Sequence, residues 1–286
     1  MTWIQALVLA VLQGTSELFP VSSLGHTVLV PALLHWKVDR SNPTFLSFVV
    51  ALHLGTALAL IVFYRQDWVR IVKALIASVV RGTLSRDPDE RLGWLLIVGT
   101  VPVALLGVFF EAPVRQFFGS TALVAVFLIV NAFVMFAGEA LRRRSFAGSP
   151  HVAVRALPDL PWSGGVRVGF AQAAALLPGI SRSGASIVAA LLLRLTHEDA
   201  ARYSFLLATP VIFAASALEV PKLFATGSRV ALEQSAAGGL LAALTAYASV
   251  AFLTRWFHAH DLRPFGWYCL IFGTVCLTLA LTKVIT

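Results

Sequence analysis

Charged residues are scarce in this chain of 286 residues: they make up 13% of it, whereas hydrophobic residues make up 58%. Charged residues make up about a quarter of an ordinary soluble domain, so the composition excludes that class and indicates a polytopic membrane protein. Acidic residues are fewer than basic ones, 14 against 22. Arginines in loops on one membrane face explain this excess, so nucleic acid is not an expected partner.

Cysteine is also nearly absent, since only Cys269 and Cys276 occur. They lie seven residues apart in one apolar run, so a shared helix would hold them about 10 Å apart, too far to form a disulfide. They therefore say nothing about the redox compartment. The N-terminus lacks the basic segment that begins a signal peptide, and we expect it to remain in the mature protein.

Long apolar runs, by contrast, are frequent. Six are long enough to cross a bilayer as helices, which takes about 20 residues, and they cover approximately residues 45–64, 92–111, 120–139, 202–221, 236–256 and 265–284. The stretch from Arg65 to Arg91, between the first two runs, is basic and amphipathic. Two further apolar segments, 3–35 and 163–195, are broken by proline and glycine, and we expect each to enter the membrane and return.

The same order of segments occurs in both halves of the chain. Gln13, Pro20, Ser22 with Ser23, and Gly25 run parallel to Gln172, Pro178, Ser181 with Ser183, and Gly184. One re-entrant segment plus three spans starts the second half on the opposite side of the membrane. We therefore predict an all-α polytopic membrane protein with an inverted-topology repeat, each half having one re-entrant helical hairpin plus three transmembrane helices. A single domain, 1–286, would comprise repeat 1 (about 1–140), a polar connector (141–161) and repeat 2 (about 162–286).

Lysine and arginine give this arrangement an orientation. If both broken segments re-enter, one face carries 15 of these residues and the other six, with Arg182 kept apart as a site residue. Cytoplasmic loops carry the excess of positive charge. We therefore expect both termini and the mouth of the first hairpin to lie outside, whereas the second hairpin enters from the cytoplasm.

The first broken segment contains the stretch QGTSELFPVSSLGH at residues 13–26. Ionisable side chains at membrane depth cost several kcal/mol and mark functional sites. Gln13 and Glu17 are four residues apart and share a helix face, where they can bind one cation or orient one water. The alternative is a buried pair that only joins helices.

Pro20 ends this half-helix and allows another to begin. Ser22, Ser23 and His26 then lie in the first turns of the new half-helix, whose free N–H groups favour an anion. Ser23 and His26 are three residues apart and can meet, which predicts a hydroxyl activated by an imidazole. Serines at a helix start also act as plain caps.

The second broken segment contains PGISRSGAS at residues 178–186. Ser181, Arg182 and Ser183 occupy the first turn of its second half-helix. A guanidinium flanked by hydroxyls at a helix N-terminus holds a phosphate with two hydrogen bonds and repels a cation. An arginine extended to a lipid headgroup is the alternative, which the apolar neighbours from Phe170 to Leu193 disfavour.

Together these residues suit a phosphate ester or anhydride with a divalent cation. From the residues alone, a hydrolase for a lipid phosphate and a transporter for a phosphorylated solute both remain open.

The two stretches resemble the two signatures of the undecaprenyl-diphosphatase family, also called bacitracin-resistance proteins. The resemblance extends over nearly the whole chain and includes the stretches HLGTALA from His53, GTVPVALLG from Gly99 and YSFLLATP from Tyr203. It implies an integral-membrane phosphatase in the bacterial plasma membrane. Such an enzyme removes the terminal phosphate of undecaprenyl diphosphate and so recycles the carrier lipid for cell-wall synthesis.

The resemblance also implies roles for individual residues. Glu17, Ser23, His26 and Arg182 would be catalytic; Ser22, Ser181, Arg182, Ser183 and Ser186 would bind substrate; and Gln13 and Glu17 would hold the divalent cation, Mg²⁺ or Ca²⁺. Gln13 stands where many members have glutamate, which removes one anionic ligand. Ser186 stands where threonine is commoner and keeps the hydroxyl.

Several alternatives stay open beside this interpretation. The nucleophile is expected to be Ser23 assisted by His26, with a water activated by His26 as the rival. A polyprenyl-phosphate transporter or flippase on the same scaffold is the second functional hypothesis, and a transporter of soluble phosphate is the third. Expected partners are the lipid substrate and membrane lipids, with a homodimer left open. His53 is considered a weaker candidate, and Asn131 and Glu139 are expected to be packing and boundary residues.

Overall fold

The computed structural model describes the chain except for residues 37, 39–42, 118–119, 148–153, 227 and 286. Within the described residues the secondary structure is helical, as predicted, apart from an isolated bridge between Pro178 and Ile180. The α-helices are α1 (Trp3–Ser16), α2 (Ser23–Leu33), α3 (Pro43–Phe63), α4 (Arg65–Arg81), α5 (Pro88–Phe117), α6 (Thr121–Ala147), α7 (Trp162–Ala173), α8 (Arg182–Leu192), α9 (His197–Thr226), α10 (Arg229–Ala259) and α11 (Arg263–Leu281). Two 3₁₀ helices are η1 (Leu157–Asp159) and η2 (Ala174–Leu176).

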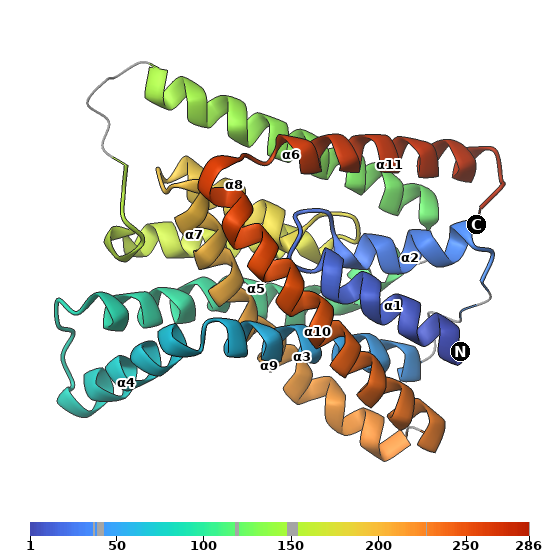
Figure 1. The fold of residues 1–286 in the computed structure, drawn as a ribbon, viewed down its shortest axis with the longest axis horizontal. Coiled ribbons are helices and arrows are strands. Elements are labelled where there is room, and N and C mark those ends of the chain that lie inside the picture. Colours follow the sequence, from blue (N-terminus) through green and yellow to red (C-terminus); the bar gives the residue numbers. More distant parts are fainter. Residues whose placement is uncertain (37, 39–42, 118–119, 148–153, 227, 286) are drawn as a thin grey trace.

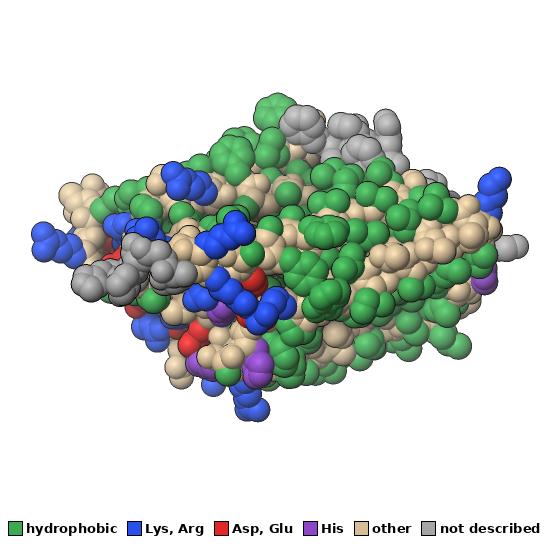
Figure 2. Space-filling view, turned by 90° about the horizontal axis from the view of Figure 1, so that it is seen from above, with side chains coloured by type: hydrophobic (Ala, Val, Ile, Leu, Met, Phe, Trp, Pro, Cys, Tyr) green, Lys and Arg blue, Asp and Glu red, His purple; other side chains and the backbone are tan. Residues whose placement is uncertain are grey.

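Among the described residues, six helices are long and apolar enough to cross a membrane: α3, α5, α6, α9, α10 and α11. Each coincides with one of the six predicted runs, so these runs are confirmed as candidate membrane-spanning helices. Large apolar side chains such as Leu240, Leu244 and Ile271 are exposed on these helices. Figure 2 shows the resulting hydrophobic surface, which lipid would cover in a multi-pass membrane protein.

The two broken segments form helical hairpins, α1 with α2 and α7 with α8 (Figure 1). At 1.5 Å per residue, α1 and α2 are about 21 and 16 Å long, shorter than the hydrocarbon core of about 30 Å. Pro20 lies in the first turn, and Pro178 and Gly179 lie in the second. Gly179 has a φ of 114°, which glycine adopts without steric cost. The turns therefore coincide with Pro20 and Pro178, whereas Gly14, Gly25 and Pro31 lie within α1 and α2.

The first helix of each hairpin packs against a long helix of the other half of the chain. Helix α1 lies along α10, and α7 lies along α5. Glycine permits both close approaches, because a Cβ at Gly14 would lie 2.3 Å from the carbonyl oxygen of Ala242, and one at Gly169 would lie 2.5 Å from that of Gly99. This packing brings the two hairpin tips into the centre of the molecule.

The long helices run between two ends of the molecule that differ in charge. Figure 1 places both termini at the end opposite the connection from α4 to α5. In the face seen in Figure 2, most Lys and Arg side chains gather at one end. This unequal distribution agrees with the predicted asymmetry of basic residues.

Helix α6 extends into the segment that the sequence assigns to a polar connector. The sequence places this connector at 141–161, but α6 continues to Ala147. The reason is that Leu141 and the arginines after it are good helix formers, so the helix extends past the apolar run. Residues 148–153 of the connector, and Lys37, lie outside the described residues.

Candidate active site

Both hairpin tips are shaped by serine caps. The Ser22 hydroxyl accepts a hydrogen bond from Gly25 N at the start of α2, and the Ser181 hydroxyl accepts one from Gly184 N at the start of α8. These bonds satisfy N–H groups that a helix start leaves without partners. The first turns of α2 and α8 thus contain the residues that the sequence predicts there.

Glu17, which follows α1, is the centre of the site. Its Oε2 atom accepts hydrogen bonds from Gln13 Nε2 at 3.0 Å and from the Ser23 hydroxyl at 2.6 Å. His53 Nε2 of α3 lies 3.3 Å from the same oxygen. The predicted pairing of Gln13 with Glu17 is therefore present, and the carboxylate also orients Ser23.

Arg182 brings the second hairpin to the same carboxylate. Its Nε and Nη2 atoms donate to Glu17 Oε1 at 3.4 and 3.2 Å, and Nη1 donates to the carbonyl oxygen of Ser204 in α9 at 3.2 Å. The Arg182 and Glu17 side chains are only 11% and 6% exposed. Arg182 is therefore buried at the meeting point of the hairpins, and the alternative of an arginine extended to a lipid headgroup is wrong.

The three serines around Arg182 have partners within the protein. Ser183 donates to the carbonyl oxygen of Phe19 in the first hairpin at 3.1 Å, and its hydroxyl lies 3.0 Å from that of Ser181. Ser186 donates to the carbonyl oxygen of Arg182 at 2.7 Å and also contacts the Ser204 hydroxyl. These contacts hold the second hairpin in place, whereas substrate binding by the serines stays a prediction.

Asn131 of α6 forms hydrogen bonds with both hairpin tips. Its Nδ2 donates to the carbonyl oxygen of Pro20 at 3.0 Å, and its Oδ1 accepts from Ser181 N at 3.0 Å. The residue is fully buried. The sequence correctly predicts a packing residue here, although not that it contacts both halves of the site.

The sequence predicts a contact between His26 and Ser23, and this prediction is wrong. His26 Nδ1 lies 2.7 Å from the carbonyl oxygen of Ser22, and its Nε2 lies 2.7 Å from the hydroxyl of Tyr268. The ring stacks against Tyr268 and Phe272 of α11, with centroids 5.7 and 5.2 Å away. Spacing alone predicts the pair, but side chains at a helix start point back along the axis, so Ser23 turns to Glu17 while His26 meets α11.

These contacts define the tautomer of His26. The carbonyl of Ser22 can only accept, so Nδ1 carries the ring proton and Nε2 accepts from the Tyr268 hydroxyl. In this arrangement the proton acceptor next to Ser23 is Glu17.

The predicted divalent cation fits the oxygen atoms of the site. Gln13 Oε1 is buried and has no hydrogen-bond partner, and Glu17 supplies a carboxylate beside it. The described residues contain no group of three His, Cys, Asp or Glu that could hold a metal. Mg²⁺ commonly uses one or two protein oxygens together with substrate phosphates, so the site suits a cation bound jointly with a phosphate substrate.

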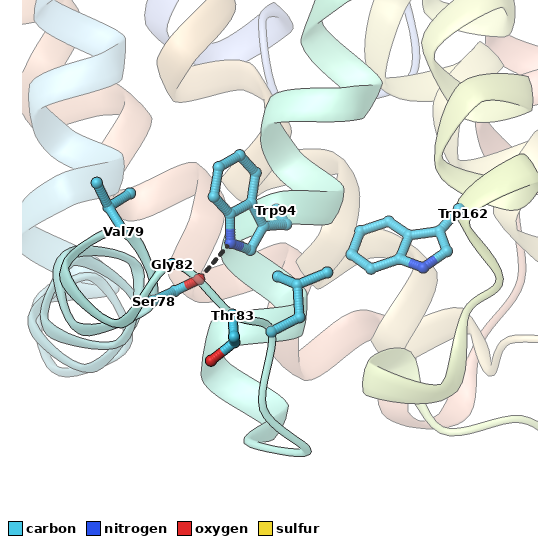
Figure 3. A pocket seen from close by; sticks show the side chains of 7 residues that line it. Ser78, Val79, Gly82, Thr83, Trp94 and Trp162 are labelled. Carbon is cyan, nitrogen blue, oxygen red and sulfur yellow. Dashed lines mark hydrogen bonds between the residues drawn. The ribbon is translucent and has the colours of Figure 1, made fainter.

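One pocket in the described part of the chain lies away from the hairpin tips. It measures about 460 Å³ and is lined by Ser78, Val79, Gly82, Thr83, Leu84, Trp94 and Trp162 (Figure 3). Trp94 donates to the Ser78 hydroxyl at 3.0 Å. Its lining holds no ionisable side chain and shares no residue with the hairpin tips, so we do not consider it the active site.

Sequence reasoning underrated His53 and did not identify Tyr268. His53 lies within an apolar span, and its position there was itself a signal, because an ionisable residue at membrane depth is costly. Tyr268 carried no such signal, since tyrosines near span ends commonly serve as interfacial anchors.

The sequence is similar to those of a known family of membrane proteins. The family described as Bacitracin resistance protein BacA matches residues 6–275. Undecaprenyl-diphosphatase 2 of Chromobacterium violaceum is 46% identical over 286 residues, covering 97% of this chain and 98% of that protein. Undecaprenyl-diphosphatase of Mycobacterium avium is 44% identical over 296 residues, covering 97% of each chain. The Undecaprenyl-diphosphatase of Acidiphilium cryptum is 42% identical over 284 residues, covering 98% of each.

Proposed function

Because the chain belongs to the bacitracin resistance protein BacA family, we propose that it is a membrane phosphatase that converts undecaprenyl diphosphate to undecaprenyl phosphate and inorganic phosphate. The similar proteins described above are named undecaprenyl-diphosphatase, and the similarity extends over nearly their whole length. The observation that supports the chemistry best is the hydrogen bond from Ser23 to Glu17, beside the guanidinium of Arg182. A nucleophile, a base and an anion-binding group are therefore adjacent, which favours the phosphatase over a transporter.

Arg182 and the N-termini of α2 and α8 bind the diphosphate. The guanidinium is already held between Glu17 and the Ser204 carbonyl, so it is oriented before substrate arrives. Preorganised positive groups stabilise the charge that develops on a transferring phosphoryl group, commonly the largest single contribution to catalysis.

Ser23 attacks the terminal phosphorus, and Glu17 accepts its proton. A bond forms between Ser23 Oγ and phosphorus while the bond to the bridging oxygen breaks, and undecaprenyl phosphate leaves with that oxygen. Water then attacks the phosphoserine, inorganic phosphate leaves, and Ser23 regains a proton. A water activated by His26 is the rival nucleophile, and this alternative requires Nε2 to exchange the Tyr268 hydroxyl for that water.

Glu17 and Gln13 Oε1 would hold the divalent cation, Mg²⁺ or Ca²⁺, whose charge would neutralise diphosphate oxygens. This role agrees with the free Oε1 atom of Gln13. Because both residues also surround Ser23, cation binding and nucleophile orientation involve the same side chains.

We also propose how the chain is arranged in the membrane. The chain forms an inverted repeat in the bacterial plasma membrane, both hairpins re-enter, and the site opens to the outer face with both termini outside. The equivalent packing of α1 on α10 and of α7 on α5 supports the repeat. The position of both termini at one end of the molecule supports their common side (Figure 1).

Phosphate release from undecaprenyl diphosphate by the purified protein tests this function. We expect release that EDTA abolishes and that excess Mg²⁺ or Ca²⁺ restores. Glu17→Gln should lower turnover at least about 100-fold, the usual contribution of a general base. Glu233→Gln, which changes an exposed carboxylate paired with Arg229, is the matched control. Lipid movement across sealed vesicles without phosphate release would instead favour a flippase.

A further inference from the structure

His53 is a buried histidine of α3 that contacts the centre of the site. Its Nε2 lies 3.3 Å from Glu17 Oε2, and its Nδ1 lies 2.8 Å from the carbonyl oxygen of Val49 one turn earlier. The two contacts hold the ring at both of its nitrogens. The ring orientation is therefore set by α3 itself and aimed at Glu17.

Hydrogen-bond geometry defines what the ring does there. The Val49 carbonyl can only accept, so Nδ1 is its donor. Glu17 Oε2 is a carboxylate oxygen, which also only accepts. The 3.3 Å contact with Nε2 is therefore an ion pair that the protonated ring of His53 makes with the carboxylate.

The two oxygens of Glu17 have different partners. Oε1 faces the guanidinium of Arg182, whereas Oε2 faces Gln13, Ser23 and His53. The carboxylate plane is thus fixed by groups from four separate helices, α1, α2, α3 and α8. Without His53, Oε2 would keep two hydrogen-bond donors. One is Gln13, which lies one helical turn before Glu17, and the other is Ser23, the reacting group itself.

We propose that His53 is a positioning residue that holds Glu17 Oε2 in line with the Ser23 hydroxyl. This inference rests on the proposed phosphatase function. His53 acts through Glu17 and not on the substrate, so its loss changes turnover more than substrate affinity. A glutamine at this position would place an amide nitrogen near the position of Nε2 and keep one donor to Glu17.

The test compares His53→Leu, which removes the donor, with His53→Gln, which keeps it. Phosphate release from undecaprenyl diphosphate in detergent micelles gives kcat and KM, and thermal unfolding gives the apparent Tm. We expect His53→Leu to lower kcat about 10- to 100-fold, the usual effect of removing a group that orients a functional residue, with KM within about threefold. His53→Gln should restore kcat to within about threefold of the wild type.

The matched control is His197, which makes a similar buried contact away from the site. Its Nε2 lies 2.7 Å from Glu139 Oε1. His197→Leu should lower the apparent Tm but leave kcat of the folded protein unchanged. If His53→Leu does not fold, His53→Asn takes its place, because its amide is one carbon too short to reach Glu17.

Three results would overturn the inference: an unchanged kcat in His53→Leu, a kcat in His53→Gln as low as in His53→Leu, or a change confined to KM. The wild-type protein is measured in parallel. Absence of phosphate release by the wild type would reject the proposed function, whereas a wild-type rate retained by His53→Leu would reject only the role of His53.

Discussion

Arg182 donates two hydrogen bonds to a single oxygen of Glu17, a residue 165 positions earlier in the chain. The pair joins the two hairpins at their tips, and both side chains are nearly inaccessible to solvent. Since Glu17 also accepts the hydrogen bond of Ser23, the pair places the acceptor of the nucleophile directly beside the anion-binding group.

Arg182→Lys should lower kcat/KM about 10- to 100-fold. Lysine keeps the charge but cannot contact Glu17 and the Ser204 carbonyl together, and each lost charged hydrogen bond costs about 1.5 to 3 kcal/mol. Initial rates at several substrate concentrations measure the effect. Arg229→Lys, at an exposed arginine, should leave the rate unchanged. Wild-type kinetics in Arg182→Lys would contradict the requirement for a planar guanidinium.

Ser23→Ala should reduce turnover at least about 100-fold, since it removes the nucleophile that Glu17 activates. A ³²P-labelled protein intermediate, trapped by acid during turnover, should be present in the wild type and absent in the variant. Ser145→Ala removes a hydroxyl that bonds only to its own helix and serves as the control. If Ser23→Ala keeps most of its turnover, the water activated by His26 becomes the nucleophile.

Asn131→Ala should lower the apparent Tm by about 5 to 10 °C, because two buried hydrogen bonds are lost and their partners remain unpaired. Asn131→Asp separates the two bonds, since it keeps the acceptor for Ser181 N but removes the donor to Pro20 O. Differential scanning fluorimetry in detergent measures both variants. A Tm unchanged in Asn131→Ala would mean that the tips are held by other contacts.

Labelling of introduced cysteines tests the topology. A cysteine at Lys37 should react with an impermeant maleimide on intact cells, whereas one at Arg143 should react only after permeabilisation. The native Cys269 and Cys276 are buried and give a low background. Labelling of both positions from the same side would reject the three spans α3, α5 and α6 between them.

The stability of the fold should depend on pH through the carboxyl group of Asp261. Burial raises the pKa of its carboxyl, but hydrogen bonds from Arg263 and the charges of Arg263 and Arg143 outweigh it, so the pKa lies below its usual range. The unfolded chain has the ordinary pKa of about 3.9. The ionised carboxylate therefore stabilises the fold above that pH, and the effect is lost as pH falls through the folded pKa.

Asp261→Asn should accordingly lower the apparent Tm by about 1 to 3 °C at pH 7. The difference from the wild type should shrink toward pH 3, as the native carboxylate becomes protonated. Thermal scans across this range provide the measurement. A difference that stays constant with pH would exclude an electrostatic origin.

Much of the fold follows from local signals. Pro20 and Pro178 mark the turns between half-helices because proline disfavours a helical residue before it, although Pro31 and Pro210 lie inside helices, and the lengths of the apolar runs predict the spans. The site is only partly predictable in this way. Gln13 and Glu17 meet because they are one helical turn apart, but the contact of Glu17 with Arg182 depends on tertiary packing that no spacing encodes.

His26 and His53 show the limit most clearly. Spacing favoured His26 as the partner of Ser23, yet the packing of α11 gives it Tyr268 instead. His53 is distant in sequence from either signature and reaches Glu17 only because α3 lies beside α1. Patterns within a single helix do not predict these contacts, because they depend on how separate helices pack.

The bridge made by Asn131 has a mechanical consequence. One amide in α6 ties the backbone of both hairpin tips together, so neither half can rock against the other without breaking it. Separation of the two tips would leave buried polar groups of Pro20 and Ser181 unpaired, and this cost opposes it.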